Sequence, residues 1–351
     1  MQQHLPANPL SRQPCQGCRP YCRPAPAGEL PVSHHPLADY VRILARGKNA
    51  SRSMSFDEAR FTMQSMLRGD YLPEQLGAIL MLLRVKEESP EEVAGFAAAI
   101  NEYWPADVQA DLIWASYAGK RRQPFWCLLS ALLLSQMGYR ILFHGSEAHT
   151  EGRLYLHELF SELQWPVVRD LNELQQSAPL RYLPCRVLHP ELQRWLLLKS
   201  ILGVRSPINT VLKTIAPPGI ASVQGVFHPN YAAAHQQAAA INGQTVVIIK
   251  GEGGEFEVNP ERRCEAYCQL PQGPAQLELL HQQSHYEDKG GLAGLAALQR
   301  VWRNEEQHAY ATEAIIGTAA LALCAIRGNA DLSLALADCR QAWAQRDTRC
   351  F

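Results

Sequence analysis

The sequence contains no uninterrupted apolar run of about 20 residues, the length that a helix needs to span a membrane. The longest candidate, Trp126 to Met137, is shorter and is interrupted by Ser130, Ser135 and Gln136. The beginning of the chain also lacks the apolar segment of a secretory signal. We therefore expect a cytoplasmic protein that does not associate with a membrane.

The net charge of the chain is also close to zero. Lys and Arg number 33 and Asp and Glu 34, so the chain as a whole has no general attraction for nucleic acid. The local balance differs, because residues 112–146 contain four basic residues and no acidic one. Residues 181–213 contain six basic residues against Glu191 alone. These two stretches are candidates for binding phosphate groups.

A second cysteine cluster, which most structural zinc sites have, is also absent. The ligands available for zinc near the start of the chain are Cys15, Cys18, Cys22 and His34 or His35. We favour the alternative that residues 1–35 form a disordered tail rich in Cys and Pro. The chain has ten cysteines and no signal segment, which indicates reduced thiols in the cytoplasm.

Residues 36–105 carry helix signals and no strand signal. Ser55 and Glu58 have the spacing of a capping box, in which each side chain caps the backbone of the other residue. Ser89-Pro90 opens a further helix, with serine as the cap and proline in the first turn. The pattern predicts a small all-helical domain, to which residues 186–216 also contribute.

After residue 105, short strands alternate with helices. Strands are expected near residues 111–117, 140–143, 181–183, 222–227 and 245–250, with helices such as 125–137 and 231–241 between them. This alternation predicts a parallel sheet covered by helices, built from residues 106–185 and 217–351. The expected fold class is α/β with a small all-helical domain.

The loop that follows the first of these strands is basic. In a parallel sheet such loops lie at the carboxyl ends of the strands, where ligands bind, and N–H groups at the start of the next helix favour anions. The alternative is a basic turn on the surface. The candidate phosphate contacts in this loop are Ser116, Gly119, Lys120, Arg121 and Arg122.

Further candidate contacts lie in turns and at the end of the second strand. Each of them could instead be a solvated or purely structural residue. They are His144, Arg46, Lys48, Arg52, Arg194, Lys199, Arg205 and Lys213.

Acidic residues follow the strand near residues 245–250. Glu252, Glu255 and Glu257 could supply oxygen ligands to Mg²⁺, which shares them with phosphates in many enzymes. No adjacent Asp-Glu pair is present. Glu255 is therefore only a weak metal candidate, and a solvated acidic turn is the preferred interpretation.

Two segments resemble a known family when they are taken together. Gln75 to Lys86 is similar to a Q-x-G-A-x-L-x-A-L-R-x-K helix, and Leu202 to Thr210 is similar to an L-G-x-R-T-x-x-N turn. Both belong to the anthranilate phosphoribosyltransferase (TrpD) family, which is grouped with pyrimidine nucleoside phosphorylases as family-3 glycosyltransferases. The resemblance implies a helical domain, an α/β domain, a hinge cleft for phosphoribosyl pyrophosphate with Mg²⁺, and a homodimer formed through the helical domains.

The sequence departs from this family where the family holds its substrates. A Gly-Thr-Gly-Gly-Asp diphosphate loop is replaced by Ala115 to Lys120, which has lost two glycines and gained the bulk of Tyr117. His-Gly-Asn-Arg keeps its first two residues but ends in Ser146-Glu147, and Lys-Gly-Glu-Thr becomes Lys86-Glu87-Glu88-Ser89. A site that binds diphosphate through fixed N–H groups and magnesium should not tolerate all these changes.

The loop and strand-end motifs are closer to the divergent YbiB-like group, a second TrpD-like group. That resemblance implies a dimer that binds nucleic acid with low sequence specificity and has lost the transferase activity. The alternative is an active phosphoribosyl- or pentosyltransferase that uses phosphoribosyl pyrophosphate with anthranilate or another acceptor. Salt-dependent binding to nucleic acid would distinguish the first hypothesis from the second.

Overall fold

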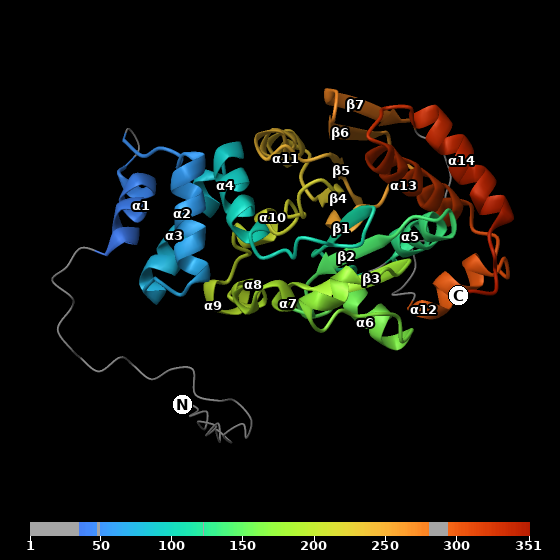
Figure 1. Cartoon of the computed structure of the whole chain (residues 1–351), viewed down its shortest axis with the longest axis horizontal. Helices are drawn as coiled ribbons and strands as arrows, with labels where there is room; N and C mark the ends of the chain where they lie inside the picture. Colours follow the sequence, from blue (N-terminus) through green and yellow to red (C-terminus); the bar gives the residue numbers. More distant parts are fainter. Residues whose placement is uncertain (1–34, 48–49, 122, 281–293) are drawn as a thin grey trace, which may run out of the picture. The chain divides into compact units, whose positions relative to one another are not determined.

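The computed structural model describes residues 35–47, 50–121, 123–280 and 294–351 (Figure 1). Residues 36–351 form one compact unit. The predictions for residues 1–34, namely a disordered tail and the zinc alternative, lie outside the described residues.

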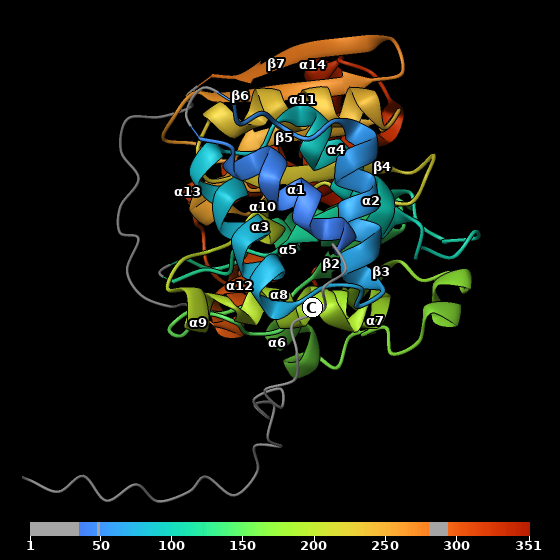
Figure 2. The same ribbon diagram turned by 90° about the vertical axis from the view of Figure 1, so that its left-hand side faces the viewer.

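Four helices precede the first strand: α1 (Pro36–Ala45), α2 (Phe56–Leu67), α3 (Pro73–Lys86) and α4 (Pro90–Asn101). The capping box predicted for Ser55 and Glu58 is confirmed, and so is Ser89 as the cap of the later helix. The Glu58 N–H donates to the hydroxyl of Ser55 at 3.3 Å, and the Ser55 N–H donates to the Glu58 carboxylate at 2.8 Å. Ser89 and Glu92 make the same exchange at the start of α4. Figure 2 shows these four helices in front of the sheet.

The strands form one sheet of seven, in the order β3-β2-β1-β4-β5-β6-β7. The first five strands are β1 (Leu112–Ser116), β2 (Ile141–Gly145), β3 (Leu180–Pro184), β4 (Ala221–Val226) and β5 (Val246–Lys250). All five are parallel, as the alternation of strands and helices predicted. The chain moves from β1 to one side and later enters β4 on the other side. The loops at the carboxyl ends of β1 and β4 therefore diverge, which is where open α/β sheets bind ligands.

The last two strands correct the prediction of a parallel sheet. β6 (Cys264–Leu270) and β7 (Gly273–Leu279) form an antiparallel hairpin that pairs with β5. Buried residues alternate with more exposed ones along β6, which is the pattern of a strand with one buried face. Gly273 has a φ of 116°, a left-handed conformation that favours glycine at this tight turn.

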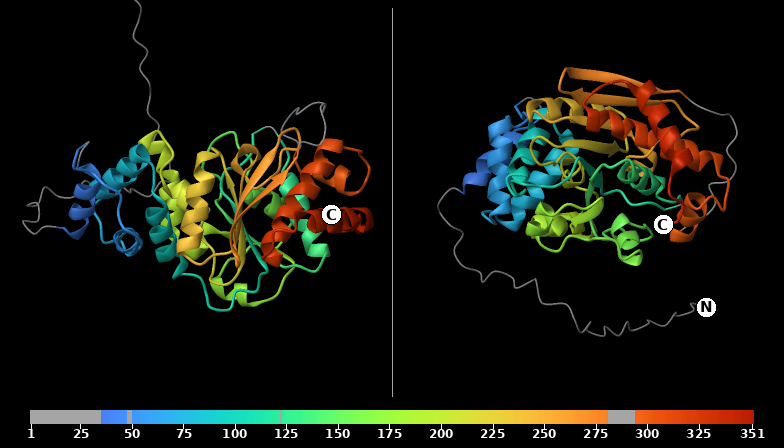
Figure 3. Two further views of the ribbon diagram at one scale, coloured as in Figure 1. Left: turned by 90° about the horizontal axis from the view of Figure 1, so that it is seen from above. Right: turned by 45° about the vertical axis from the view of Figure 1, so that its right-hand side comes forward.

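Helices cover both faces of the sheet (Figure 3). One core contains α5 (Trp126–Gln136), α6 (Leu156–Glu162), α12 (Leu295–Trp302), α13 (Ala309–Arg327) and α14 (Leu332–Gln345). The other contains α1 to α4 with α7 (Cys185–Leu188), α8 (Pro190–Leu197), α9 (Lys199–Leu202) and α10 (Ile208–Val211). The chain also has α11 (Asn230–Ile241), which packs on β4 and β5, and the 3-10 turns η1 (Leu171–Gln175) and η2 (Glu252–Gly254).

Alternate residues of β1 belong to the two cores. Leu112 and Trp114 pack in the first, whereas Ile113 and Ala115 pack in the second, because successive side chains of a strand point to opposite faces. The helices of the second core therefore share one apolar core with the sheet. The division into domains near residues 105 and 186–216 stays a prediction.

The longest apolar helix is α13, which corrects the prediction that Trp126 to Met137 is the longest apolar segment. Among the described residues, α13 is the one helix long and apolar enough to cross a membrane, with a mean hydropathy of 1.6 over its most apolar window. Of that window, 78% is buried inside the protein. Packing against α5, α14 and the sheet accounts for its apolar character.

Two helical glycines give opposite expectations for the same substitution. A Cβ at Gly95 of α4 would lie 2.4 Å from the carbonyl oxygen of Phe56, whereas a Cβ at Gly77 of α3 would have no atom within 4 Å. We expect Gly95→Ala to destabilise the protein by about 1–3 kcal/mol, because α2 and α4 must separate. Gly77→Ala should stabilise it by about 0.5–1 kcal/mol, since alanine loses less entropy in a helix. Urea unfolding of both variants measures the difference, and equal effects would contradict the close packing of α2 on α4.

Candidate functional site

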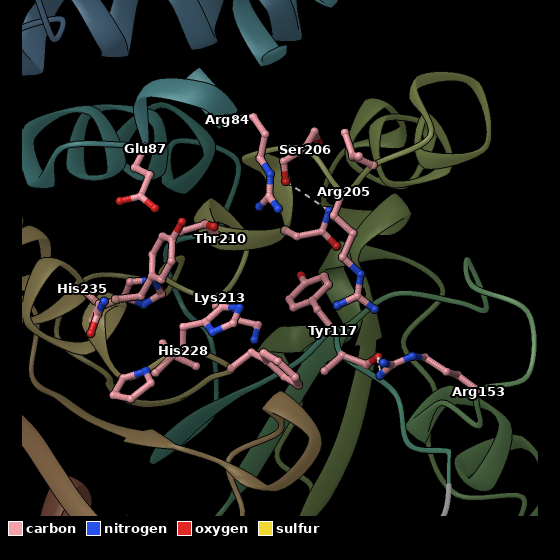
Figure 4. Close-up of a pocket in the computed structure, with 18 residues that line it drawn as sticks. Arg84, Glu87, Tyr117, Arg153, Arg205, Ser206, Thr210, Lys213, His228 and His235 are labelled. Atoms are coloured by element: carbon pink, nitrogen blue, oxygen red, sulfur yellow. Dashed lines mark hydrogen bonds between the residues drawn. The ribbon is translucent and has the colours of Figure 1, made fainter. Parts of the chain in front are cut away.

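A cavity of about 680 Å³ lies at the carboxyl ends of β1 and β4 (Figure 4). Its walls come from the end of α3, the loop after β1, the turn before α10 and the segment after β4. The lining residues include Arg84, Glu87, Tyr117, Ala118, Arg153, Arg205, Asn209, Lys213, Phe227, His228, Tyr231 and His235. The cavity therefore occupies the point of the sheet where the topology predicts a ligand.

Basic side chains gather at this cavity. Arg153, Arg205 and Lys213 line it and lie close enough for their charges to interact, and Arg153 also lies close to Arg121 and Lys199. Burial lowers the pKa of Arg153 most, and the charges of Arg205 and Arg121 lower it further. The pKa of Lys199 is lowered in the same way, first by desolvation and then by its cationic neighbours. We call these five residues the cation cluster.

Lys213 is the cluster member held most firmly. Its ammonium group donates to the carbonyl oxygens of Gly225 at 2.6 Å and Gly254 at 2.9 Å. Burial lowers the pKa of Lys213 to about 8, and the charges of Arg205 and Arg153 lower it while that of Glu255 raises it. A lysine whose pKa is moved toward neutrality beside a cavity is typical of a functional site.

Arg153 connects the cluster to the loop after β1. Its guanidinium donates to the carbonyl oxygens of Ala118 and Gly119, both at 2.8 Å. Its Nε is buried and has no hydrogen-bond partner among the described residues. The side chain of Arg205 makes no hydrogen bond or ion pair within the described ranges, and it lies beside the cavity (Figure 4). Both side chains can therefore take up an anionic ligand.

The backbone of the loop after β1 faces a carboxylate of the same chain. The N–H groups of Ala118 and Gly119 both donate to Oε1 of Glu255, each at 2.8 Å. Glu255 is only 1% exposed. The prediction that Gly119 contacts phosphate through the loop backbone is therefore corrected, because Glu255 already occupies its donor.

Lys120 also needs a correction. It is 3% exposed, and its ammonium group forms an ion pair with Glu257 and donates to the carbonyl oxygen of Pro124 at 3.0 Å. The second carboxylate oxygen of Glu257 accepts the Cys127 N–H at 2.8 Å. We withdraw Lys120 from the candidate phosphate contacts, because its charge is neutralised inside the protein.

The contacts of Glu255 and Glu257 also determine whether these carboxylates could hold Mg²⁺. Glu255 and Glu257 are engaged by the loop after β1, and the described residues contain no group of three or more His, Cys, Asp or Glu that could hold a metal ion. The residues present do not fit the Mg²⁺ site that the family resemblance implied. The weak candidate Glu255 is buried, so it is not the solvated acidic turn that was preferred either.

His144 lies behind the cavity wall. It is 1% exposed, and its Nδ1 shares a hydrogen bond of 2.9 Å with the hydroxyl of Tyr117, which lines the cavity. Burial lowers the pKa of His144 to about 3, so the ring is neutral near pH 7. We withdraw His144 as a direct phosphate contact, because it offers no charge and reaches the cavity only through Tyr117.

The remaining predicted residues that the structure describes are not among those that line the cavity. Arg52 makes two hydrogen bonds to Glu58, at 2.6 and 2.7 Å, and Arg194 is paired with Glu191. Arg46 is exposed after α1, and Ser116 is the buried last residue of β1. Lys48 and Arg122 lie outside the described residues. Of the predicted set, the structure brings together Arg121, Lys199, Arg205 and Lys213.

Sequence reasoning missed most of the residues that line the cavity, among them Arg84, Glu87, Arg153 and Phe227. Arg84 lies in the family-like helix, which was a usable signal, whereas Arg153 stands alone between Gly152 and Leu154 and gave none. Glu87 replaces the glycine of the family's Lys-Gly-Glu-Thr motif and keeps a backbone conformation that favours glycine, with φ 65° and ψ 140°. Such strain in a cavity wall points to a role for its side chain.

Comparisons with known proteins agree with this architecture. A family model described as the helical bundle domain of a glycosyl transferase family matches residues 38–103. The protein YbiB of Escherichia coli (strain K12) is 30% identical over 241 residues, which cover 64% of this chain and 74% of YbiB. Anthranilate phosphoribosyltransferase of Thermus thermophilus is 27% identical over 216 residues, which cover 59% of this chain and 65% of that enzyme.

Solved structures show the same fold. The crystal structure of anthranilate phosphoribosyltransferase (TrpD) from Thermus thermophilus matches with a TM-score of 0.70 and 22% identity, over 87% of this chain and 94% of that one. The enzyme of Saccharomyces cerevisiae in complex with PRPP and Mg matches with a TM-score of 0.67 and 17% identity, over 89% and 94% of the two chains. At these sequence identities the similarity establishes the fold alone, and any activity has to be argued from the residues of the site.

The strain at Glu87 predicts a substitution that stabilises the protein. Glu87→Gly should relieve an unfavourable conformation worth about 1–3 kcal/mol, against which glycine loses about 0.5–1 kcal/mol of entropy. A net gain of about 1 kcal/mol is therefore expected in urea unfolding. Glu74→Gly in the first turn of α3 is the control, and it should destabilise the protein by about 0.5–1 kcal/mol. A loss of stability at position 87 would show that no strain is present.

The pKa of Lys213 predicts a pH dependence of stability. Its folded-state pKa of about 8 lies below the usual lysine value of 10.5, so the folded state disfavours the charged form. Between these values the unfolded state binds more protons, and stability therefore rises with pH. Relative to Lys213→Met, the wild type should gain about 1–3 kcal/mol between pH 8 and pH 10. Urea unfolding at several pH values measures this, and a difference that stays constant or shrinks as pH rises would contradict it.

Proposed function

This chain belongs to the glycosyl transferase family that includes Escherichia coli YbiB, and we propose that it binds single-stranded nucleic acid rather than transferring a phosphoribosyl group. The observation that carries the proposal is the cation cluster. Arg153, Arg205 and Lys213 line one cavity and repel one another, and Arg121 and Lys199 lie close enough to Arg153 to add to that repulsion. An anionic ligand would relieve that repulsion, and a phosphodiester chain offers one negative charge per nucleotide.

Aromatic side chains beside the cluster support a single strand as the ligand. Phe227 is 56% exposed and packs against His228 with ring centroids 4.9 Å apart. Tyr231 lines the same cavity. Exposed rings next to cations are the arrangement on which unpaired bases stack while their phosphates are neutralised. Duplex bases are already stacked on one another and gain less from these rings.

A phosphoribosyl- or pentosyltransferase is the second candidate. The size of the cavity and its place at the switch point of the sheet favour it, and the Saccharomyces cerevisiae neighbour is a complex with PRPP and Mg. In such an enzyme Arg153 and Arg205 would have to hold the diphosphate, because Lys120 is buried against Glu257. Oε1 of Glu255 accepts two N–H groups and Glu257 is paired with Lys120, so the described residues offer no cluster of free carboxylates for Mg²⁺, which supports the binding protein over transfer to anthranilate or another acceptor.

We further propose that the chain acts as a homodimer in the cytoplasm. Apolar side chains on the helical bundle, namely Phe61, Leu72 and Val85, are 39%, 42% and 84% exposed. Contact between two bundles would cover them and would bring two cation clusters into one particle. Two clusters on one strand raise affinity through effective concentration.

The proposal predicts salt-dependent binding of a short oligonucleotide. A fluorescent single strand should bind the wild type at about 50 mM salt and lose at least roughly tenfold in affinity at about 200 mM, because bound cations are released. Arg205→Ala and Arg153→Ala should each weaken binding roughly 3- to 10-fold. Arg263→Ala removes an exposed arginine that is paired with Glu278 on the β6–β7 hairpin, and it serves as the matched control.

Three outcomes would count against nucleic-acid binding. They are no binding at the lower salt concentration, an affinity that does not change with salt concentration, and a loss of affinity in Arg263→Ala as large as that in Arg205→Ala and Arg153→Ala. Consumption of phosphoribosyl pyrophosphate in the presence of Mg²⁺ would favour the transferase. Fluorescence anisotropy and isothermal titration calorimetry on the same preparations distinguish the two functions.

A further inference from the structure

The loop after β1 has the geometry of an anion-binding site. Gly119 has a φ of 66°, and its N–H converges with that of Ala118 on a single acceptor. Consecutive N–H groups that point to one place form a concave site for an anion. Ala118 also lines the cavity, so this site adjoins the space in which a ligand would lie. The acceptor is the carboxylate of Glu255.

Glu255 is fixed in this position by its backbone. A Cβ at Gly225 would lie 2.3 Å from the carbonyl carbon of Glu255, and a Cβ at Gly251 would lie 1.5 Å from its carbonyl oxygen. Lys213 holds Gly254, the residue before Glu255, because its ammonium group donates to the carbonyl oxygen of Gly254 at 2.9 Å. The carboxylate cannot withdraw from the loop without movement of several close-packed backbone segments.

The carboxylate is incompletely satisfied and has an effect on the cluster. Its Oε1 accepts two hydrogen bonds, whereas Oε2 is buried and has no partner among the described residues. Its charge raises the pKa of both Lys213 and Arg153. Glu255 therefore places a buried carboxylate beside the cations of the cavity.

We propose that Glu255 is an internal anion that fills the place of a second phosphate and restricts the cavity to ligands with single phosphate groups. Phosphodiesters and monophosphate esters would bind at Arg153, Arg205 and Lys213. The additional phosphate of a diphosphate would meet a carboxylate and two N–H groups that are already occupied. This inference rests on the proposed function only in requiring a phosphorylated ligand, and it makes Glu255 a specificity-determining residue.

The test compares adenosine monophosphate with adenosine diphosphate in the absence of metal ions. A cation cluster alone would bind the diphosphate more tightly, because it carries more negative charge. We expect the wild type to bind the diphosphate no more tightly than the monophosphate. In Glu255→Gln and Glu255→Ala the preference should shift by roughly tenfold or more toward the diphosphate, as removal of a nearby like charge allows. Isothermal titration calorimetry measures both affinities.

Glu252→Gln is the matched control. Glu252 lies in the same segment, but its side chain accepts a hydrogen bond from Asn259 instead of from the loop after β1. Its substitution should leave the preference unchanged. A wild type that strongly prefers the diphosphate would overturn the proposal, and so would a preference that Glu255→Gln leaves unaltered. Failure of both nucleotides to bind wild type and variants would overturn it as well.

A measurement on the wild type covers the case in which the variants do not fold. In protein labelled with ¹⁵N-glycine, the amide signal of Gly119 should stay unchanged during titration with adenosine diphosphate, because Glu255 holds that N–H. A saturable shift of this signal would show that the ligand displaces Glu255. This result is independent of the oligonucleotide experiment. A protein that binds no nucleic-acid strand could still distinguish a monophosphate from a diphosphate.

Discussion

The buried ion pair between Lys120 and Glu257 determines how the whole site is arranged. It links the loop after β1 to the segment after β5, and Glu257 also accepts the N–H at the start of α5. Three parts of the chain are thereby held in one register, with the N–H groups of Gly119 and Ala118 turned toward Glu255. Removal of one partner would leave an uncompensated charge in the interior, which typically costs about 3–5 kcal/mol.

This arrangement separates the charges of the site into two layers. The carboxylates of Glu255 and Glu257 lie in the interior. Glu257 forms an ion pair with Lys120, and Glu255 accepts hydrogen bonds from the loop backbone. The guanidinium and ammonium groups of Arg153, Arg205 and Lys213 remain at the cavity. Of the basic residues of this loop that the structure describes, Lys120 is therefore neutralised, and Arg121 alone contributes its charge to a ligand. The charge available to the ligand comes mostly from other segments.

The sequence predicts the elements better than it predicts the site. The helix caps and the five parallel strands followed from local patterns, because caps and periodicity depend on near neighbours. Lys120 and Arg121 are adjacent and equivalent in sequence, yet only Lys120 is buried, because it pairs with Glu257. Local patterns could not predict this pair, since the two residues lie 137 positions apart. Arg153 gave no signal for the same reason. The β6–β7 hairpin was missed although β6 carries the alternation of a strand with one buried face.

The occupied loop after β1 has a kinetic consequence. An empty phosphate loop becomes ordered when its ligand arrives, and that ordering takes free energy from binding. Here Glu255 already accepts hydrogen bonds from the N–H groups of Ala118 and Gly119, so a ligand does not have to order these two donors. Association is then governed by electrostatic steering, and release requires only the separation of charges. For the nucleic-acid binding that we propose, a complex of this kind is suited to brief encounters with many sites along a strand.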